Sequence, residues 1–321
     1  MSKKIVALLL SLLMIPVFSA CGNTNSSSTA GSNAESSTSS TASQASTAES
    51  KKIKVSVTFN AMKEFTEAVG KDRVEISTII PDGTEPHDFE PKAKDLTELS
   101  SAQVFVYSGF GMEAWADKAI EAANNKNLVA VEASKGATPI QNTDAGEVKE
   151  HGQYDPHIWI SLKGAETEAQ SIRDGLIKAD PASADYFKQN CASFVSQLES
   201  LYSEYNTKFQ TTKSKSFVTG HAAFAYLCRD FELKQNSVED VFAEGEPSAQ
   251  KLAGLVDYCK KDNVKTIFVE DMVSPAVSQT LAKQVGAKVK KIYTIESGED
   301  NKTYLERMKS NLNEIYDSLS E

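Results

Sequence analysis

The stretch DPASADYFKQNCASFVSQLESLYSEYNTKFQTT, residues 180–212, decides how the rest of the chain is divided. Asp180 followed by Pro181 is typical of a helix start, because proline tolerates the first helical position. Apolar residues then recur in steps of three and four. They are Tyr186, Phe187, Cys191, Phe194, Val195, Leu198, Leu201, Tyr202 and Tyr205. The spacing predicts one helix of roughly six turns, and its central place indicates a rigid strut between two lobes.

On the N-terminal side of this helix, short β-rich runs alternate with helical patterns. The predicted strands are 53–59, 74–80, 104–108 and 128–131, and the predicted helices are 61–69, 92–101, 113–123 and 163–179. Such alternation predicts a parallel sheet with right-handed crossovers. The segment 136–155 has little apolar periodicity and holds Gly, Pro, Asn and Asp, so we expect an exposed loop there.

The alternation resumes on the C-terminal side. The predicted strands are 216–219, 235–238, 266–269 and 289–294, and the predicted helices are 222–231, 248–261, 275–285 and 301–319. Each half therefore carries about four strand–helix units, which indicates an α/β fold. Residues 51–321 are enough for one large domain or two medium domains, each with its own core.

The N-terminus carries the marks of an export signal. Lys3 and Lys4 precede an apolar run over 5–18, and two small residues precede Cys21. The run is shorter than the about 20 apolar residues that a membrane span needs. The small residues before Cys21 resemble the lipobox of bacterial lipoproteins, in which the cysteine is acylated and becomes the mature N-terminus. An ordinary cleaved signal with an accidental cysteine is the alternative.

The segment 22–50 consists almost entirely of Ser, Thr, Ala, Asn and Gly, so it cannot bury enough surface to offset the entropy of ordering. We interpret it as a flexible tether for an anchored module. The predicted organisation is a signal peptide over 1–20, a lipidated cysteine and tether over 21–50, an N-terminal lobe over 51–179, a linking helix over 180–212 and a C-terminal lobe over 213–321.

Charge and cysteine content exclude several classes of protein. The net charge is −10 and no long basic run exists, so nucleic-acid binding is not expected. After Cys21 only Cys191, Cys228 and Cys259 remain, an odd number without a C-x-x-C pair. At most one disulfide can form, and a thiolate metal site is not expected.

Three of the four histidines lie in loops or at predicted strand ends. His87 follows the predicted strand 74–80, His157 lies in Asp-Pro-His-Ile-Trp, and His221 follows the predicted strand 216–219 and opens the next helix. Ligands bind outside the carboxyl ends of strands in open α/β sheets, so these imidazoles are expected to converge. Imidazole suits zinc and neighbouring transition metals. His151 lies in the predicted loop, with at most an auxiliary metal contact.

A fourth ligand is expected from an acid at a strand end of the C-terminal half. Glu270 and Asp271 follow the predicted strand 266–269, and Glu296 follows the predicted strand 289–294. Position alone does not choose among them, because an acid near a helix start is often only a solvated or capping group.

Three motifs, in order, resemble those of the cluster A-I solute-binding proteins, which are the zinc and manganese receptors of ABC importers. They are Glu85-Pro-His-Asp-Phe-Glu-Pro91, Asp155-Pro-His-Ile-Trp159 and Thr219-Gly-His-Ala-Ala-Phe-Ala-Tyr226. Gly245-Glu-Pro-Ser-Ala249, Phe268-Val-Glu-Asp-Met-Val-Ser-Pro275 and Leu281-Ala-Lys-Gln-Val-Gly-Ala287 are similar to further family segments.

The resemblance implies two α/β lobes, each with a four-stranded parallel sheet flanked by helices, joined by one long rigid helix with the metal between the lobes. It implies that His87, His157, His221 and Glu296 bind one ion, with Glu270 in support. It also implies an extracytoplasmic, lipid-anchored, monomeric receptor that delivers the ion to an ABC permease and its ATPase. The sequence lacks the long His-rich and acidic run that some zinc members carry before the second motif, and the loop there holds only His151.

Manganese members of the family are similar but carry a carboxylate at the position of His221. Three nitrogen donors and one oxygen donor suit the tetrahedral preference of zinc, so Zn2+ is expected rather than manganese or iron. A zinc hydrolase is the rival class, but no H-E-x-x-H and no candidate base are present, so no enzyme is expected. A surface adhesin on the same fold is a further alternative.

Overall fold

The chain is built around two parallel sheets of four strands each. A computed structural model describes residues 51–143, 148–149, 152–243, 247–271 and 274–321. The predicted signal peptide, Cys21, the tether and His151 lie outside these residues.

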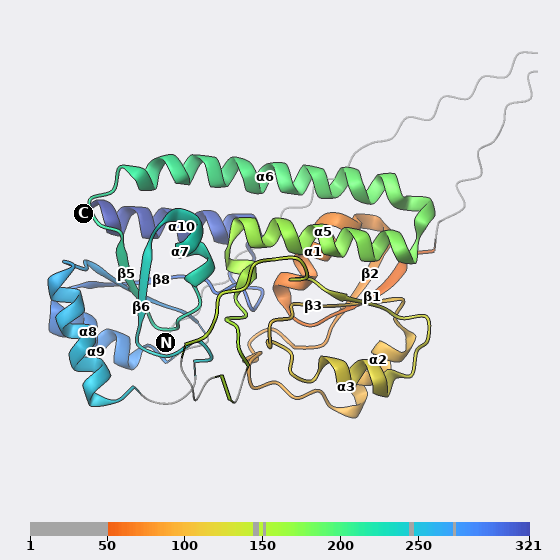
Figure 1. The fold of residues 1–321 in the computed structure, drawn as a ribbon, viewed down its shortest axis with the longest axis horizontal. Helices are drawn as coiled ribbons and strands as arrows, with labels where there is room; N and C mark the ends of the chain where they lie inside the picture. The colour runs from red at the N-terminus through yellow and green to blue at the C-terminus, as the bar shows by residue number, and fades with distance from the viewer. Residues whose placement is uncertain (1–50, 144–147, 150–151, 244–246, 272–273) are drawn as a thin grey trace, which may run out of the picture. The chain divides into compact units, whose positions relative to one another are not determined.

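The first sheet contains β1 (Ile53–Val57), β2 (Val74–Thr78), β3 (Val104–Tyr107) and β4 (Val129–Glu132) in the order β2-β1-β3-β4. Its central strands are rich in Val and are buried, as strands covered on both faces must be. The helices α1 (Asn60–Gly70) and α5 (Leu162–Ala179) pack together on one face, and α2 (Ala93–Ser101) and α3 (Ala116–Ala123) pack together on the other (Figure 1).

The second sheet contains β5 (Ser216–Thr219), β6 (Lys234–Ser237), β7 (Thr266–Val269) and β8 (Lys288–Lys291) in the order β6-β5-β7-β8. The two sheets therefore share one strand order, although their sequences show no clear repeat. Around this sheet lie α7 (Ala225–Phe231), α8 (Ala249–Lys261), α9 (Pro275–Val285) and α10 (Tyr304–Ser320), with α8 and α9 packed against each other. The predicted fold class is confirmed.

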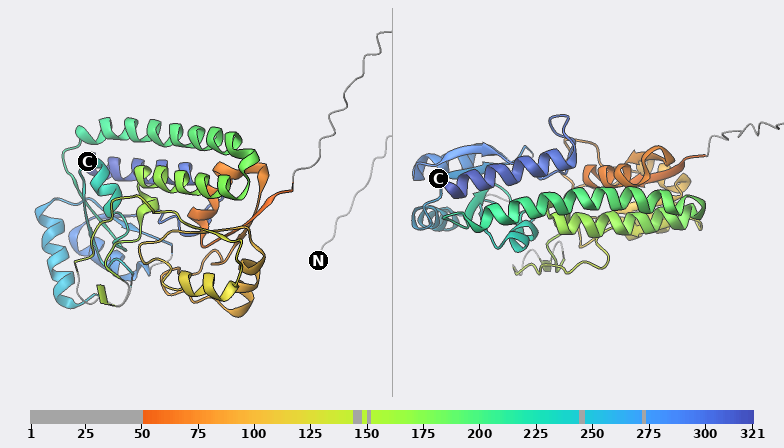
Figure 2. Two further views of the ribbon diagram at one scale, coloured as in Figure 1. Left: turned by 45° about the vertical axis from the view of Figure 1, so that its right-hand side comes forward. Right: turned by 90° about the horizontal axis from the view of Figure 1, so that it is seen from above.

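The long helix α6 (Ala184–Gln210) follows a short turn over Pro181–Ser183, as the stripe of apolar residues predicts. It runs along the helical layer of both halves (Figures 1 and 2). It packs on α1 and α5 of the first half and on α10 of the second. This helix therefore joins the two sheets rigidly.

The hydrophobic core differs from the expectation of one core in each domain. A single cluster of buried residues includes Val106 of the first sheet, Phe194 of α6 and Phe217 and Leu312 of the second half. A smaller cluster, with Val218 and Leu281 among its members, lies beneath α8 and α9. The shared core follows from α6, because its buried stripe covers both halves.

Two predicted element boundaries near the histidines and acids are wrong. The helix after β5 begins at Ala225 rather than at residue 222. The carbonyl of His221, which would accept the first hydrogen bond of the longer helix, instead accepts from Gln235 Nε2 at 2.8 Å and from Thr219 Oγ1. The strand β8 ends at Lys291 rather than at residue 294. The backbone N–H of Tyr293 donates to the side chain of Asn311, which thus replaces a neighbouring strand.

Cys191, Cys228 and Cys259 are all free and buried. They pack as small apolar side chains. Among the described residues, none of the helices combines the length and the apolar character needed to traverse a bilayer.

Candidate metal centre

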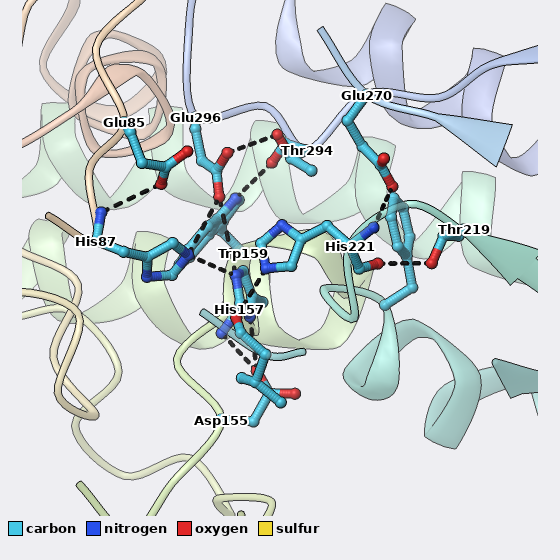
Figure 3. A network of polar contacts seen from close by, with 12 residues as sticks. Glu85, His87, Asp155, His157, Trp159, Thr219, His221, Glu270, Thr294 and Glu296 are labelled. Atoms are coloured by element: carbon cyan, nitrogen blue, oxygen red, sulfur yellow. Dashed lines mark hydrogen bonds and ion pairs between the residues drawn. The ribbon is translucent and has the colours of Figure 1, made fainter. Parts of the chain in front are cut away.

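Four side chains from distant parts of the sequence meet at one point. His87, His157, His221 and Glu296 each offer one ligand atom, and these atoms all lie within 4.8 Å of one another. Figure 3 shows the three imidazole rings and the carboxylate converging. The structure thus brings together the three predicted histidines and one of the three candidate acids.

The distances within this group suit a small cation. His87 Nε2 lies 3.1 Å from His157 Nε2, and each of these nitrogens lies 3.8 Å from Glu296 Oε1. A tetrahedral zinc ion with bonds of about 2.0–2.1 Å separates its ligand atoms by about 3.3–3.4 Å. Two neutral imidazoles that face each other with lone pairs repel, and a cation between them removes that repulsion.

Asp155 orients His157. Its Oδ1 atom lies 2.9 Å from His157 Nδ1 and also accepts the backbone N–H of His157 at 2.9 Å. A carboxylate that accepts the Nδ1 proton leaves the lone pair on Nε2, which faces the centre. Glu85 stands two residues before His87 and likewise accepts its backbone N–H. Neither acid was predicted from the sequence, although the repeated acid-Pro-His pattern is a signal for both.

His221 is held differently. Its Nε2 lies 2.7 Å from the carbonyl oxygen of Val241, so a neutral ring carries its proton there and its lone pair on Nδ1. Coordination through Nε2 would require this hydrogen bond to break. The backbone N–H of His221 donates to Glu270 Oε1 at 3.3 Å. Burial, together with the nearby His157, lowers the pKa of His221 to about 3, so the ring is neutral and able to bind a metal.

One of the two carboxylate oxygens of Glu296 is left without a hydrogen bond within the described ranges. Glu296 Oε2 accepts a hydrogen bond from Thr294 Oγ1 at 2.7 Å, whereas the buried Oε1 has no hydrogen-bond partner among the described residues. Burial, and then the Glu85 carboxyl, raises the pKa of Glu296 well above its usual range. A buried oxygen without a partner is costly, and a cation at the centre would satisfy it.

Glu270 and Asp271 do not join the group. Glu270 supports the turn of His221 and lies so close to Gly220 that a Cβ atom there would meet Glu270 Oε2 at 2.4 Å. A side chain at residue 220 would therefore have to displace the carboxylate of Glu270. Asp271 accepts a hydrogen bond from Lys291 Nζ at 2.6 Å. The resemblance implies that Glu270 supports the site without binding the metal, and its hydrogen bond to the backbone of His221 is a contact of that kind.

Aromatic rings close the sides of the centre. The ring of Phe242 lies 5.3 Å from that of His87, and the ring of Trp159 lies 5.2 Å from that of His157. Both aromatic side chains are buried. Side-chain exposure of His87 and Glu296 is only 1% each, so an ion at this point would be largely shielded from water.

The comparisons identify the family. Residues 55–318 match the family described as "Zinc-uptake complex component A periplasmic", and the chain belongs to it. A protein of Treponema pallidum described as a putative metal-binding protein is 44% identical over 84% of this chain and 88% of its own length. The high-affinity zinc uptake system protein ZnuA of Bacillus subtilis is 33% identical over 94% of this chain and 93% of its own length.

A solved structure shares the fold. The laminin-binding protein Lmb of Streptococcus agalactiae, described as bifunctional with adhesin and metal-transporting activity, aligns with a TM-score of 0.77 and 35% identity. The alignment covers 84% of this chain and all of that one. The family resemblance seen in the motifs is therefore confirmed, and the chain is a receptor component rather than an enzyme.

Glu270 makes the stability of the zinc-free protein depend on pH. Burial raises the pKa of Glu270 to about 8 from its usual 4.5, so the folded protein holds an extra proton between these values. The stability from this group is fully present below pH 4.5 and is lost as the pH rises through 8, with a slope of up to about 1.4 kcal/mol per pH unit. We therefore expect Glu270→Gln to flatten the fall in unfolding free energy above pH 6.5.

Urea unfolding in the presence of a chelator, from pH 6.5 to 8, measures this slope. The opposite slope of His221, whose folded pKa is lowered, shrinks from pH 6.5 to 8 as the unfolded histidine becomes neutral, and it is the same in both proteins. Equal slopes for the wild type and Glu270→Gln would show that Glu270 is ionised throughout this range.

Proposed function

We propose that this chain is an extracytoplasmic receptor that binds zinc with high affinity at His87, His157, His221 and Glu296 and delivers it to an ABC importer. The observation that carries the proposal is the convergence of three imidazoles on a buried carboxylate oxygen that has no hydrogen-bond partner in the described part of the chain. Membership in a zinc-uptake family and similarity to a zinc uptake protein support the same cargo.

The donor set favours zinc over manganese. Three nitrogens and one oxygen make a site of borderline softness, whereas manganese prefers a site richer in oxygen and a higher coordination number. The residue at the third histidine position, His221, is buried and supplies nitrogen rather than a carboxylate oxygen. Manganese or iron transport by the same site is the alternative.

Competition titration of the metal-free protein tests this choice. We expect zinc to displace manganese completely at equal concentrations, with a dissociation constant for zinc at least about a hundredfold lower, which corresponds to about 2.8 kcal/mol. Isothermal titration calorimetry with each metal, followed by the competition, gives both constants. A lower dissociation constant for manganese than for zinc would identify the chain as a manganese receptor.

We further propose that the chain is exported and anchored in the cell membrane through acylated Cys21, with 22–50 as its tether. The basic, apolar and small residues that precede Cys21 support this proposal. A single acyl chain binds a bilayer only marginally, so stable anchoring would require diacylation. Mass spectrometry of the mature N-terminus tests it, because a lipid-free terminus at another residue would contradict the anchor.

We also propose boundaries for the two lobes and for the helix that links them. We place one metal-binding lobe over 51–179 and the other over 213–321, with 180–212 as the link. Ligands from both lobes of one monomeric chain then bind a single ion. Because α6 and the shared core join the lobes, release at the permease would require a local rearrangement rather than a wide hinge opening.

A further inference from the structure

The short segment 294–298, which carries Glu296, belongs to the C-terminal half of the chain but is hydrogen-bonded to the N-terminal half. The carbonyl of Glu296 accepts the backbone N–H of Asn60 at 3.3 Å. The amide of Gly83 donates to Ser297 Oγ at 2.9 Å, and the amide of Gly298 donates to Asp82 Oδ1 at 2.8 Å. These contacts bridge more than 200 residues of sequence.

The backbone just before Glu296 is in an unfavourable conformation. Ile295 is fully buried and has a φ of 62°, a region that β-branched residues rarely adopt. Such strain persists only where the surroundings determine the conformation. It turns the chain after β8 so that the next side chain, Glu296, points at the imidazoles (Figure 3).

A buried ion pair lies directly behind this segment. Arg307 of α10 is completely buried, and its guanidinium donates to the carboxylate of Glu64 in α1 and to the carbonyl of Ser297. Glu64 also accepts the side-chain amide of Asn60 at 2.6 Å and the backbone N–H of Tyr304. The pair therefore connects α1, α10 and the Glu296 segment through one carboxylate and one guanidinium.

We propose that Glu64 and Arg307 are positioning residues for zinc binding, which hold Glu296 at the centre by fixing the segment 294–298 against α1. The inference rests on the proposed function, because it concerns the affinity of the same site. Neither residue belongs to the group of candidate ligands. Buried ion pairs contribute little net stability on average, so stability alone does not explain why this pair is present. A role in fixing one geometry of the site does explain it.

The test compares zinc affinity, measured by chelator competition, among variants of the full mature chain. We expect Glu64→Gln to raise the zinc dissociation constant about ten- to hundredfold, the usual loss when a group that orients a metal ligand is changed. Asn190→Ala is the matched control. Its buried side chain donates to Val69 O at the other end of α1, so it disturbs the same helix and should change the constant less than about twofold.

A double-mutant cycle with Glu296→Gln separates positioning from a general loss of stability. If Glu64 acts through Glu296, then Glu64→Gln should change zinc affinity less than about twofold once Glu296 is already replaced. Equal losses in the two backgrounds would overturn the inference. If Glu64→Gln does not fold, Asp82→Ala takes its place in the cycle, because Asp82 is exposed and yet accepts the amide of Gly298.

The same measurements keep this inference distinct from the proposed function. A wild-type protein that does not bind zinc, or a Glu296→Gln variant that binds as tightly as the wild type, would contradict the proposed site itself. Tight wild-type binding, weakened by Glu296→Gln but unaffected by both Glu64→Gln and Asp82→Ala, would leave the site standing and refute the positioning role.

Discussion

Replacement of His221 by alanine is expected to weaken zinc binding by at least two to three orders of magnitude, or roughly 3–4 kcal/mol. The imidazole is buried, neutral and directed at the other three candidate ligands, and no other histidine of the described residues can replace it. The secondary structure should be retained, because the ring lies in a turn between β5 and α7 and outside both elements.

Two variants make this result specific. Cys228→Ala removes another buried side chain from the following helix, α7, and should leave zinc affinity unchanged. His221→Asp replaces nitrogen by oxygen and should reduce the preference for zinc over manganese, because the donor set becomes harder. Chelator competition for both metals, with circular dichroism as the check on folding, measures these effects. Zinc affinity within threefold of the wild type in His221→Ala would remove His221 from the site.

Replacement of Trp159 by alanine is expected to lower the free energy of unfolding by about 3–5 kcal/mol, the usual cost of truncating a large buried aromatic residue. Trp159 is fully buried and packs edge-on against Phe59 at 4.8 Å. Its indole N–H donates to Thr294 O at 2.8 Å, so it joins the second histidine motif to the segment of Glu296. The variant should therefore also bind zinc more weakly.

Trp115 is the matched control because the chain has only two tryptophans. Trp115 is partly exposed at the start of α3. Trp115→Ala should therefore lower the free energy of unfolding by less than about half as much as Trp159→Ala does. Urea unfolding of both variants in the presence of a chelator measures the difference. Trp115→Phe leaves Trp159 as the single indole fluorophore, 5.2 Å from His157, and its emission should change on addition of zinc. Equal destabilisation by both alanine variants would contradict the role assigned to Trp159.

Helix and strand boundaries could be predicted from the sequence to different degrees. The apolar stripe of α6 predicted its length within a few residues, because helical periodicity is a local property that repeats over many turns. The strands were predicted less well where a side chain replaces a strand partner, as Asn311 does for Tyr293. The late start of α7 has the same kind of cause, because the side chain of Gln235 donates to the carbonyl of His221, which the first turn of a longer helix would use.

The sequence by itself determined the α/β class, the long central helix, the family and the three histidine motifs, because each of these depends on residues close together along the chain. Position along the chain left Glu270, Asp271 and Glu296 open and the resemblance implied Glu296, but only the tertiary structure shows how its carboxylate comes to lie beside the histidines. The reason is that the position of Glu296 depends on contacts with Asn60, Asp82 and Gly83, and on Arg307 and its partner Glu64. Contacts that span more than 200 residues leave no local pattern in the sequence.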